Sequence, residues 1–137
     1  FYVRAGHPLL AQRNIAPSAM TKFGVASVRL PVPVRDVVRQ LLGVKPDEPL
    51  PISVECDDVH LLKRVALSSD TVLACTDAAV RDEVDTGKIY ELQLRGVPPL
   101  YSEMGVVSLT GRTLSPVAQF AVDFLRDLAG PTKRVAA

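Results

Sequence analysis

The sequence contains little cysteine: Cys56 and Cys75 are the only two among 137 residues. Small secreted domains held together by disulfides normally contain more, so we expect a reducing, cytoplasmic environment. No apolar run approaches the roughly 20 residues that a helix needs to span a bilayer. No secretion signal is visible, and the chain begins with Phe1 rather than methionine, which predicts a fragment.

An excess of either charge is also lacking. The chain has 16 basic and 15 acidic side chains, and its longest basic run is Lys133-Arg134. This balance is unsuited to a chain that binds nucleic acid or anionic lipid by itself. A G-x-S-x-G motif, a phosphate-binding loop and a pair of catalytic carboxylates are missing as well. We therefore expect no enzyme activity, no cofactor and no membrane partner.

A regular alternation of strands and helices is present between Lys22 and Leu94. Strands are expected at 23–28, 51–56, 71–75 and 89–94, and helices at 34–42, 57–67 and 76–87. Parallel strands need a crossover between them, which is usually a helix. The pattern therefore predicts an α/β fold with a mostly parallel sheet flanked by helices.

The ends of the expected helices are marked by residues that favour starts and stops. Gly43 is suited to end the first helix, and Asp57 and Thr76 are suited to cap the next two. A further strand is expected at 105–109. Ser115 followed by Pro116 predicts the start of a last helix that runs to about Leu128. Its apolar face contains Val117, Phe120, Ala121, Phe124, Leu125 and Leu128.

The candidate binding residues follow the strands, because open parallel sheets bind ligands beyond the carboxyl ends of their strands. The positions selected by this rule are Arg29, Leu30, Pro31, Asp57, Asp58, Thr76 and Asp77. Helix amino termini begin there, and their N–H groups and dipoles attract anions. Arg29 or Arg35 can pair with a carboxylate, and Thr76 can donate a hydrogen bond.

Each of these residues also has a plain structural interpretation. Asp57 and Thr76 can simply cap helices, and the arginines can be solvated. The three aspartates at this edge also oppose an anionic ligand, which keeps a neutral or cationic effector open. His7, which precedes Pro8, is expected to be structural rather than catalytic.

Three segments of the chain together resemble the effector-binding domain of LysR-type transcriptional regulators. The first contains Val3-Arg4-Ala5-Gly6-His7-Pro8-Leu9, and the second, 70–94, contains the turn Gly87-Lys88-Ile89. The third contains Arg112-Thr113-Leu114-Ser115-Pro116-Val117-Ala118, followed by Phe120 and Phe124-Leu125-Arg126. Two departures lie near the cleft: Ser68-Ser69-Asp70 stands where the family often has Gly-x-Gly, and Thr76 replaces a common proline. They leave the effector class open.

The resemblance implies two α/β lobes of the type II periplasmic-binding-protein kind, with a small-molecule effector between them. Residues 21–94 would form the second lobe, and 1–20 would be the end of the first lobe and the crossover. Residues 95–104 would return to the first lobe, 105–130 would supply a strand and a helix to it, and 131–137 would be a frayed tail. DNA would be bound only through an amino-terminal domain absent from this chain.

The resemblance also bears on partners and on the cysteines. The family dimerises through helices and strands, here 34–42 and 89–94. The apolar face of the last helix predicts either self-association or an atypical docking of this helix. Its lobe order would place Cys56 and Cys75 about 9.6 Å apart, two strand spacings, which is too far for a disulfide. Asp58 and His60 could complete a metal site with them, but the spacing fits no standard zinc pattern, so buried thiols and no metal are expected.

Two other functions share this pattern of elements. A transporter's solute-binding protein has the same fold, although the missing secretion signal and the His7-Pro8 segment argue against it. A small α/β enzyme would need a catalytic pair, which the sequence does not offer. The preferred interpretation is the ligand-sensing regulatory domain of a LysR-type regulator.

Overall fold

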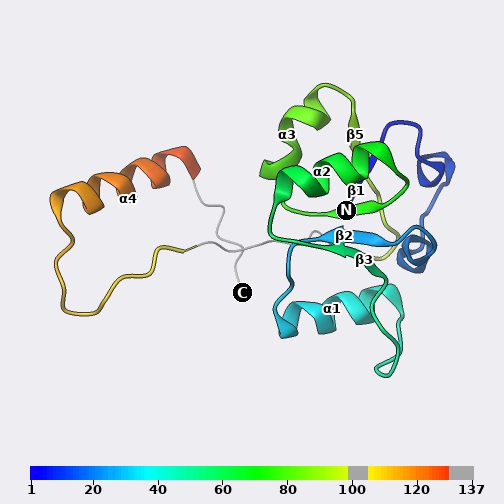
Figure 1. The fold of residues 1–137 in the computed structure, drawn as a ribbon, viewed down its shortest axis with the longest axis horizontal. Coiled ribbons are helices and arrows are strands. Elements are labelled where there is room, and N and C mark those ends of the chain that lie inside the picture. Colours follow the sequence, from blue (N-terminus) through cyan, green and yellow to red (C-terminus); the bar gives the residue numbers. More distant parts are fainter. Residues whose placement is uncertain (99–104, 130–137) are drawn as a thin grey trace. The chain divides into compact units, whose positions relative to one another are not determined.

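The structure, a computed structural model, describes residues 1–98 and 105–129 (Figure 1). The chain divides into two compact units, Phe1–Leu100 and Tyr101–Ala137, here called unit 1 and unit 2. Among the described residues, no helix is long and apolar enough to cross a membrane.

Unit 1 contains the alternation of strands and helices that the sequence predicts. Its strands are β1 (Tyr2–Arg4), β2 (Val25–Ser27), β3 (Ile52–Glu55), β4 (Val72–Ala74) and β5 (Ile89–Glu91). Its α-helices are α1 (Val32–Leu42), α2 (Val59–Ser68) and α3 (Asp77–Asp85), and two 3₁₀ helices, η1 (Pro8–Ala11) and η2 (Pro17–Lys22), precede β2. The observed elements lie within about two residues of most of the expected limits.

The five strands form one sheet in the order β3-β2-β4-β1-β5. β2 pairs in parallel with both β3 and β4, which confirms the mostly parallel sheet. β1 pairs antiparallel with β4 and β5, so β4 and β5 run in the same direction. β1 comes from the segment 1–20 and lies inside the sheet whose other strands come from residues 21–94, and both Tyr2 and Val3 are buried there.

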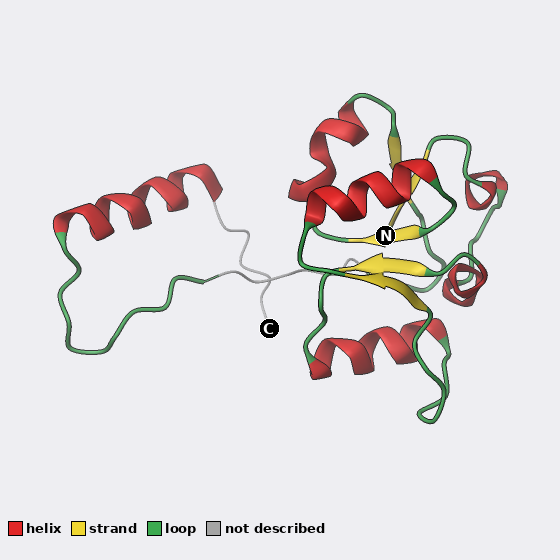
Figure 2. Ribbon diagram, viewed as in Figure 1, coloured by secondary structure: helices red, strands yellow, loops and turns green. Residues whose placement is uncertain are grey.

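The sheet is covered on both faces, α2 and α3 on one and α1 on the other (Figures 1 and 2). One core cluster joins the sheet to α2 and α3 and contains Tyr2, Ala26, Leu62, Ala66, Leu73, Val80 and Ile89. The second joins it to α1, η1 and η2 and contains Val3, Leu9, Ile15, Met20, Leu42, Val72 and Leu92. Burial on both faces explains why β4 reads as a continuous apolar run.

The end of α1 agrees with the sequence, but the cap of α2 is a different residue from the one expected. Gly43 ends α1 in the left-handed conformation at φ 67°. Asp57 was expected to cap α2, but the cap is Asp58, whose carboxylate accepts hydrogen bonds from the backbone N–H groups of His60 and Leu61. In the sequence, either of the two adjacent aspartates could cap the helix. Which one does so depends on where the helix begins after β3, and α2 begins at Val59, directly after Asp58.

The segment 68–70, where the sequence departs from Gly-x-Gly, anchors the start of the chain. Arg4 forms a 2.6 Å ion pair with the Asp70 carboxylate. The backbone N–H of Leu9 donates to Nδ1 of His7, so the ring proton lies on Nε2, which donates to the Asp70 carbonyl at 2.9 Å. His7 is 2% exposed and has both ring nitrogens bonded, in agreement with a structural role.

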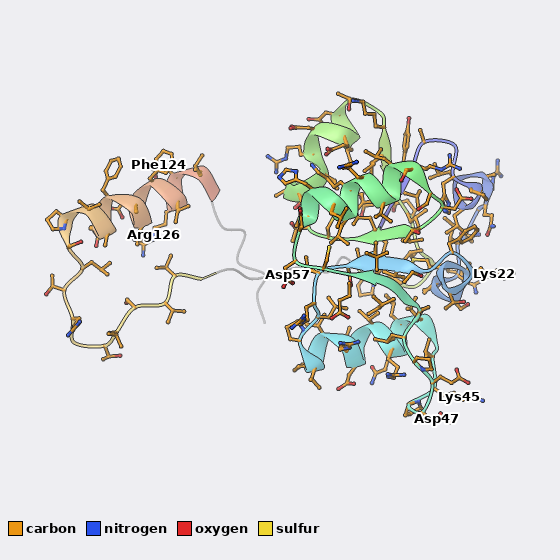
Figure 3. All side chains as sticks on the ribbon, viewed as in Figure 1. Lys22, Lys45, Asp47, Asp57, Phe124 and Arg126 are labelled. Atoms are coloured by element: carbon orange, nitrogen blue, oxygen red, sulfur yellow. The ribbon has the colours of Figure 1, made fainter. Side chains whose placement is uncertain are left out.

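Unit 2 contains α4 (Pro116–Ala129), whose start agrees with the prediction because Ser115 Oγ accepts from the N–H of Ala118. The strand expected at 105–109 is not found: this segment is irregular. A strand needs a neighbour for its hydrogen bonds, and none of the described strands pairs with it. The apolar face of α4 is exposed in the single chain, and Phe124 and Arg126 project from different sides of the helix (Figure 3).

Candidate effector-binding site

The residues selected from the sequence lie at one edge of the sheet in unit 1. β2, β3 and β4 are adjacent and parallel, and the last residue of β2, Ser27, is in register with Glu55 and Ala74. The three strands therefore end at the same level, and the chain leaves them toward α1, α2 and α3. We call this the carboxyl edge. Figure 3 shows Asp57 at this end of the unit and Lys22 at the opposite end.

Asp57 and Asp58 are adjacent, but they do different things. The Asp58 carboxylate is committed to the start of α2, where it accepts bonds of 2.9 and 3.1 Å. Asp57 is exposed, and its carboxylate accepts a long 3.4 Å bond from the backbone N–H of Arg29. This contact brings together the segments that follow β2 and β3. Asp57 thus keeps most of its hydrogen-bonding capacity, while Oδ1 of Asp58 is used by the start of α2.

The segment after β2 contains Arg29, Leu30 and Pro31, and it leads into α1. Arg29 Nε lies 3.7 Å from one carboxylate oxygen of Glu55, and a guanidinium nitrogen of Arg35 lies 3.5 Å from the other. The side chain of Arg29 is 78% exposed, so this pair is strongly screened by water. Leu30 is half-buried, and Pro31 stands at the N-cap position of α1.

Thr76 and Asp77 are exposed at the end of β4. Thr76 occupies the N-cap position of α3, but its side chain makes no capping hydrogen bond. Asp77 instead accepts a 2.8 Å bond from the N–H of Ala78. The expected capping role of Thr76 is therefore absent, and its hydroxyl is free to bond to a ligand.

Sequence reasoning missed Glu55 and Ser27. Glu55 was not among the candidate residues, although it links two arginines at the carboxyl edge. Ser27 is fully buried, and its Oγ has no hydrogen-bond partner among the described residues. Burying an unbonded hydroxyl costs about 1–3 kcal/mol. The available signal was a serine within the otherwise mostly apolar segment 23–28.

The two cysteines are separate free thiols, Cys56 after β3 and Cys75 after β4. β2 lies between these strands, in the order that the resemblance implied. Burial raises the pKa of the Cys75 thiol to about 11, so it is protonated at neutral pH. Among residues 1–98 and 105–129, no three His, Cys, Asp or Glu side chains are grouped so that they could hold a metal ion.

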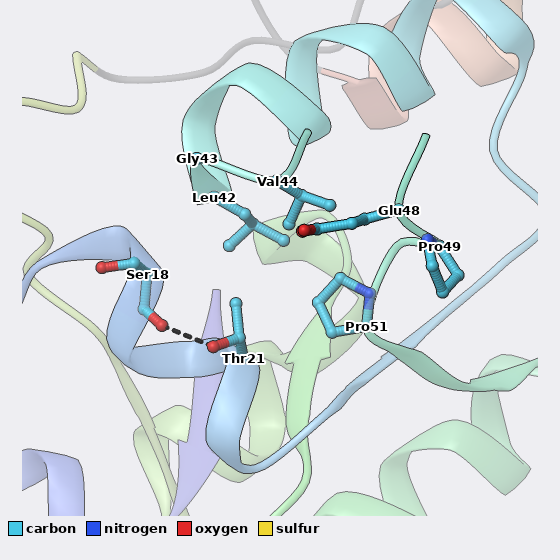
Figure 4. A pocket seen from close by; sticks show the side chains of 8 residues that line it. All are labelled: Ser18, Thr21, Leu42, Gly43, Val44, Glu48, Pro49 and Pro51. Carbon is cyan, nitrogen blue, oxygen red and sulfur yellow. Dashed lines mark hydrogen bonds between the residues drawn. The ribbon is translucent and has the colours of Figure 1, made fainter. Parts of the chain in front are cut away.

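A hollow of about 320 Å³ lies elsewhere, at the end of α1 (Figure 4). Its lining residues are Ser18, Thr21, Leu42, Gly43, Val44, Glu48, Pro49 and Pro51. The Thr21 hydroxyl donates to the Ser18 carbonyl at 2.8 Å, and Glu48 pairs with Lys45. Since these polar groups already have partners, we interpret the hollow as a packing seam between α1, η2 and the segment before β3.

Together, the parallel sheet, its two helical layers and its carboxyl edge define an α/β ligand-binding lobe of the type II periplasmic-binding-protein kind. The family model described as the LysR substrate binding domain matches residues 1–130, and the chain belongs to this family. The fold expected from the sequence is thereby confirmed. The family also favours a regulatory, ligand-binding role over transport or catalysis.

One curated relative is the "SDS degradation transcriptional activation protein" of Pseudomonas sp. (strain ATCC 19151). It is 31% identical over 121 residues, which cover 86% of this chain and 38% of the relative. The chain thus spans well under half the length of this relative. No solved structure matches the chain.

Proposed function

We propose that this chain is the effector-sensing part of a LysR-type transcriptional regulator of the cytoplasm and that the carboxyl edge of unit 1 binds the effector. The observation that carries the proposal is the convergence of three strand-to-helix junctions at one edge. Arg29, Asp57 and Thr76 all have polar atoms there that the fold does not fully use. Open parallel sheets bind their ligands at such edges.

The effector we propose is a small organic anion, such as a carboxylate or an alkyl sulfate. Arg29 and Arg35 supply positive charge, and the helix amino termini at this edge add N–H donors. The name of the curated relative refers to degradation of SDS, an anionic detergent, which supports the inclusion of alkyl sulfates. The aspartates at the edge repel anionic ligands. If the effector proves to be neutral, the proposal of an anionic effector is wrong.

The test is a thermal-shift screen of carboxylates, alkyl sulfates and neutral metabolites on the complete regulator. A ligand that binds only the folded state at 100 times its Kd stabilises it by about 2.7 kcal/mol, which raises Tm measurably. We expect Thr76→Val to reduce this shift, because it removes an unbonded hydroxyl from the edge.

The matched control is Thr86→Val, at the other end of α3, where the hydroxyl already donates to the Asp82 carbonyl. It should leave the ligand-induced shift unchanged. If no compound stabilises the regulator, or if both threonine variants respond to the ligand like the parent protein, the assignment of the edge is wrong.

We also propose that the regulator works as a homo-oligomer and contacts DNA through a part of the protein outside these residues. β5 is an edge strand of the sheet, and α1 exposes Val34 and Val37. These two elements match the expected contact segments 34–42 and 89–94. Sedimentation of the parent and of Val37→Glu checks this: the charge should dissociate the oligomer, and an unchanged sedimentation coefficient would exclude α1 from the contact.

A further inference from the structure

The amino terminus of α1 differs from those of the other two helices at the carboxyl edge. α2 is capped by the Asp58 carboxylate, and α3 has Asp77 in its first turn. The 11-residue α1 has Pro31 at its N-cap position, no side-chain cap and no acidic residue in its first turn. The positive end of the helix dipole is therefore uncompensated there. In the first turn of α1, the N–H groups of Val34 and Arg35 donate to the Pro31 carbonyl. The N–H of Val32 has no hydrogen-bond partner among the described residues.

An independent observation at the same place is the buried hydroxyl of Ser27. Ser27 is in register with Glu55 in the parallel ladder, and registered residues project from the same face of a sheet. Glu55 pairs with Arg35 at the start of α1, so this face is the one that α1 covers. The unbonded Ser27 hydroxyl therefore faces the start of α1, where it lacks the partner that buried polar groups normally have.

The charged groups around this point leave donors unused. The distances of 3.7 Å from Arg29 and 3.5 Å from Arg35 to Glu55 are too long for strong hydrogen bonds. Among the residues that the structure describes, the Asp57 carboxylate accepts a single hydrogen bond, from the backbone N–H of Arg29 at 3.4 Å. Asp36, the next residue of α1, is exposed. The single carboxylate of Glu55 therefore forms only weak ion pairs with the guanidinium groups of Arg29 and Arg35.

We propose that the start of α1, with Ser27, Arg29 and Arg35, is the subsite for the oxyanion head group of the effector, a carboxylate or a sulfate ester. The Ser27 hydroxyl and the Val32 N–H donate to the oxyanion, and the two arginines neutralise it. Glu55 competes with the oxyanion for these arginines. This inference rests on the proposed function, since it names the part of the carboxyl edge that binds the charged end of the effector.

The test is a titration of the ¹⁵N-labelled chain, at constant ionic strength, with sodium sulfate, sodium acetate or sodium chloride, followed by amide chemical shifts. We expect saturable shifts at residues 29–35 with sulfate and acetate but not with chloride. Which of the two binds more tightly distinguishes a sulfate ester from a carboxylate as the head group. Equal, unsaturated shifts at the starts of α1, α2 and α3 would indicate an adventitious ion only and would overturn the proposal.

Two variants should move the anion affinity in opposite directions. Ser27→Ala removes a hydrogen bond to a charged group and should weaken binding about tenfold. Glu55→Gln removes a competing charge about 4 Å from the arginines and should strengthen binding about fivefold. The control is Arg64→Gln on the exposed side of α2, which removes a positive charge from the chain but not from the edge and should leave the anion affinity unchanged.

Thermal stability separates this role from a merely structural one. Ser27→Ala deletes an unsatisfied buried group, so its Tm should equal or exceed that of the parent while its anion affinity falls. Unchanged anion affinity in Ser27→Ala, or a fall in Glu55→Gln, would overturn the proposal. If effectors from the screen shift amides after β3 and β4 but not residues 29–35, this subsite is wrong and the proposed function stands.

Discussion

α2 in unit 1 and α4 in unit 2 are both amphipathic, but they are buried very differently. Leu62 and Ala66 of α2 are 0% exposed against the sheet. On α4, Phe120 is 71% and Phe124 is 54% exposed in the single chain, and Val122 is the buried apolar residue. The difference shows that apolar periodicity identifies the face a helix can bury, while burial itself depends on a partner surface.

The largest expected contrast between the units is in amide hydrogen exchange. Amides of β2 and β4 lie in the centre of the sheet and should exchange only when unit 1 unfolds globally. Isolated helices of about 14 residues are marginal in water, so α4 amides should exchange orders of magnitude faster. Exchange at low protein concentration, read by mass spectrometry, checks this. Strong protection of α4 at every concentration would show that the helix is already packed.

The second largest contrast is expected in the free energy of unfolding when an apolar side chain of each unit is truncated. Leu73 of β4 is fully buried, and Leu73→Ala should lower the free energy of unfolding by about 2–5 kcal/mol. Phe124→Ala removes a larger side chain but should change it by less than about 0.5 kcal/mol, because the ring is already exposed. Urea unfolding measures both. An equal loss in the two variants would remove the distinction drawn here.

The two histidines allow a matched comparison inside unit 1. His7→Ala deletes a buried ring with two hydrogen bonds and should cost about 2 kcal/mol, since it leaves the Leu9 N–H and the Asp70 carbonyl unbonded. His60→Ala, on the exposed side of α2, should be nearly neutral. Thermal unfolding compares them, and a neutral His7→Ala would mean that the His7–Asp70 contact does not hold the first segment to β4.

The smallest effect concerns acid stability, through the 2.7 Å ion pair of Lys63 on α2 with Glu83 on α3. The hydrogen bond from Lys63 lowers the pKa of Glu83 below its usual 4.5. A lowered carboxyl pKa stabilises the fold above the unfolded-state pKa, and this contribution is lost as pH falls through the folded-state pKa. Glu83→Gln should therefore destabilise by at most about 1 kcal/mol at pH 7 and less below pH 4.

The control for the acid experiment is Glu48→Gln, in an exposed pair with Lys45 at 3.7 Å. It should leave the pH dependence of Tm almost unchanged. A loss in Glu83→Gln that grew as the pH fell would mean that the fold raises the pKa of Glu83 instead of lowering it.

Local signals in the sequence predicted much of the fold. Gly43 ends α1 and Ser115 starts α4, because a left-handed turn and a capping hydroxyl depend on the residue itself. Non-local pairing was not predictable in the same way. The apolar run at Tyr2 and Val3 fits any sheet with two buried faces, and the sequence contains nothing that selects β4 and β5 as its neighbours. The segment 105–109 has strand propensity, but none of the described strands pairs with it.

The sequence was sufficient to predict at which edge of the sheet the candidate site lies. The alternation of strands and helices predicts parallel strands, and parallel strands bring Arg29, Asp57 and Thr76 to the same edge. The roles of single residues depend on three-dimensional neighbours. Glu55 pairs with arginines from two segments, and the isolation of the Ser27 hydroxyl is visible only once α1 is placed over the sheet.

The position of β1 has a consequence for how the protein is made. Tyr2 pairs with Leu73 and Glu91, which the ribosome adds about 70 and about 90 residues later. At roughly 5–20 residues per second, the first strand waits on the order of 5–20 s for its neighbours. During that interval an apolar segment stays unpaired in the nascent chain. The order of synthesis therefore leaves β1 without its neighbours until β4 and β5 have been made, although it precedes both in the chain.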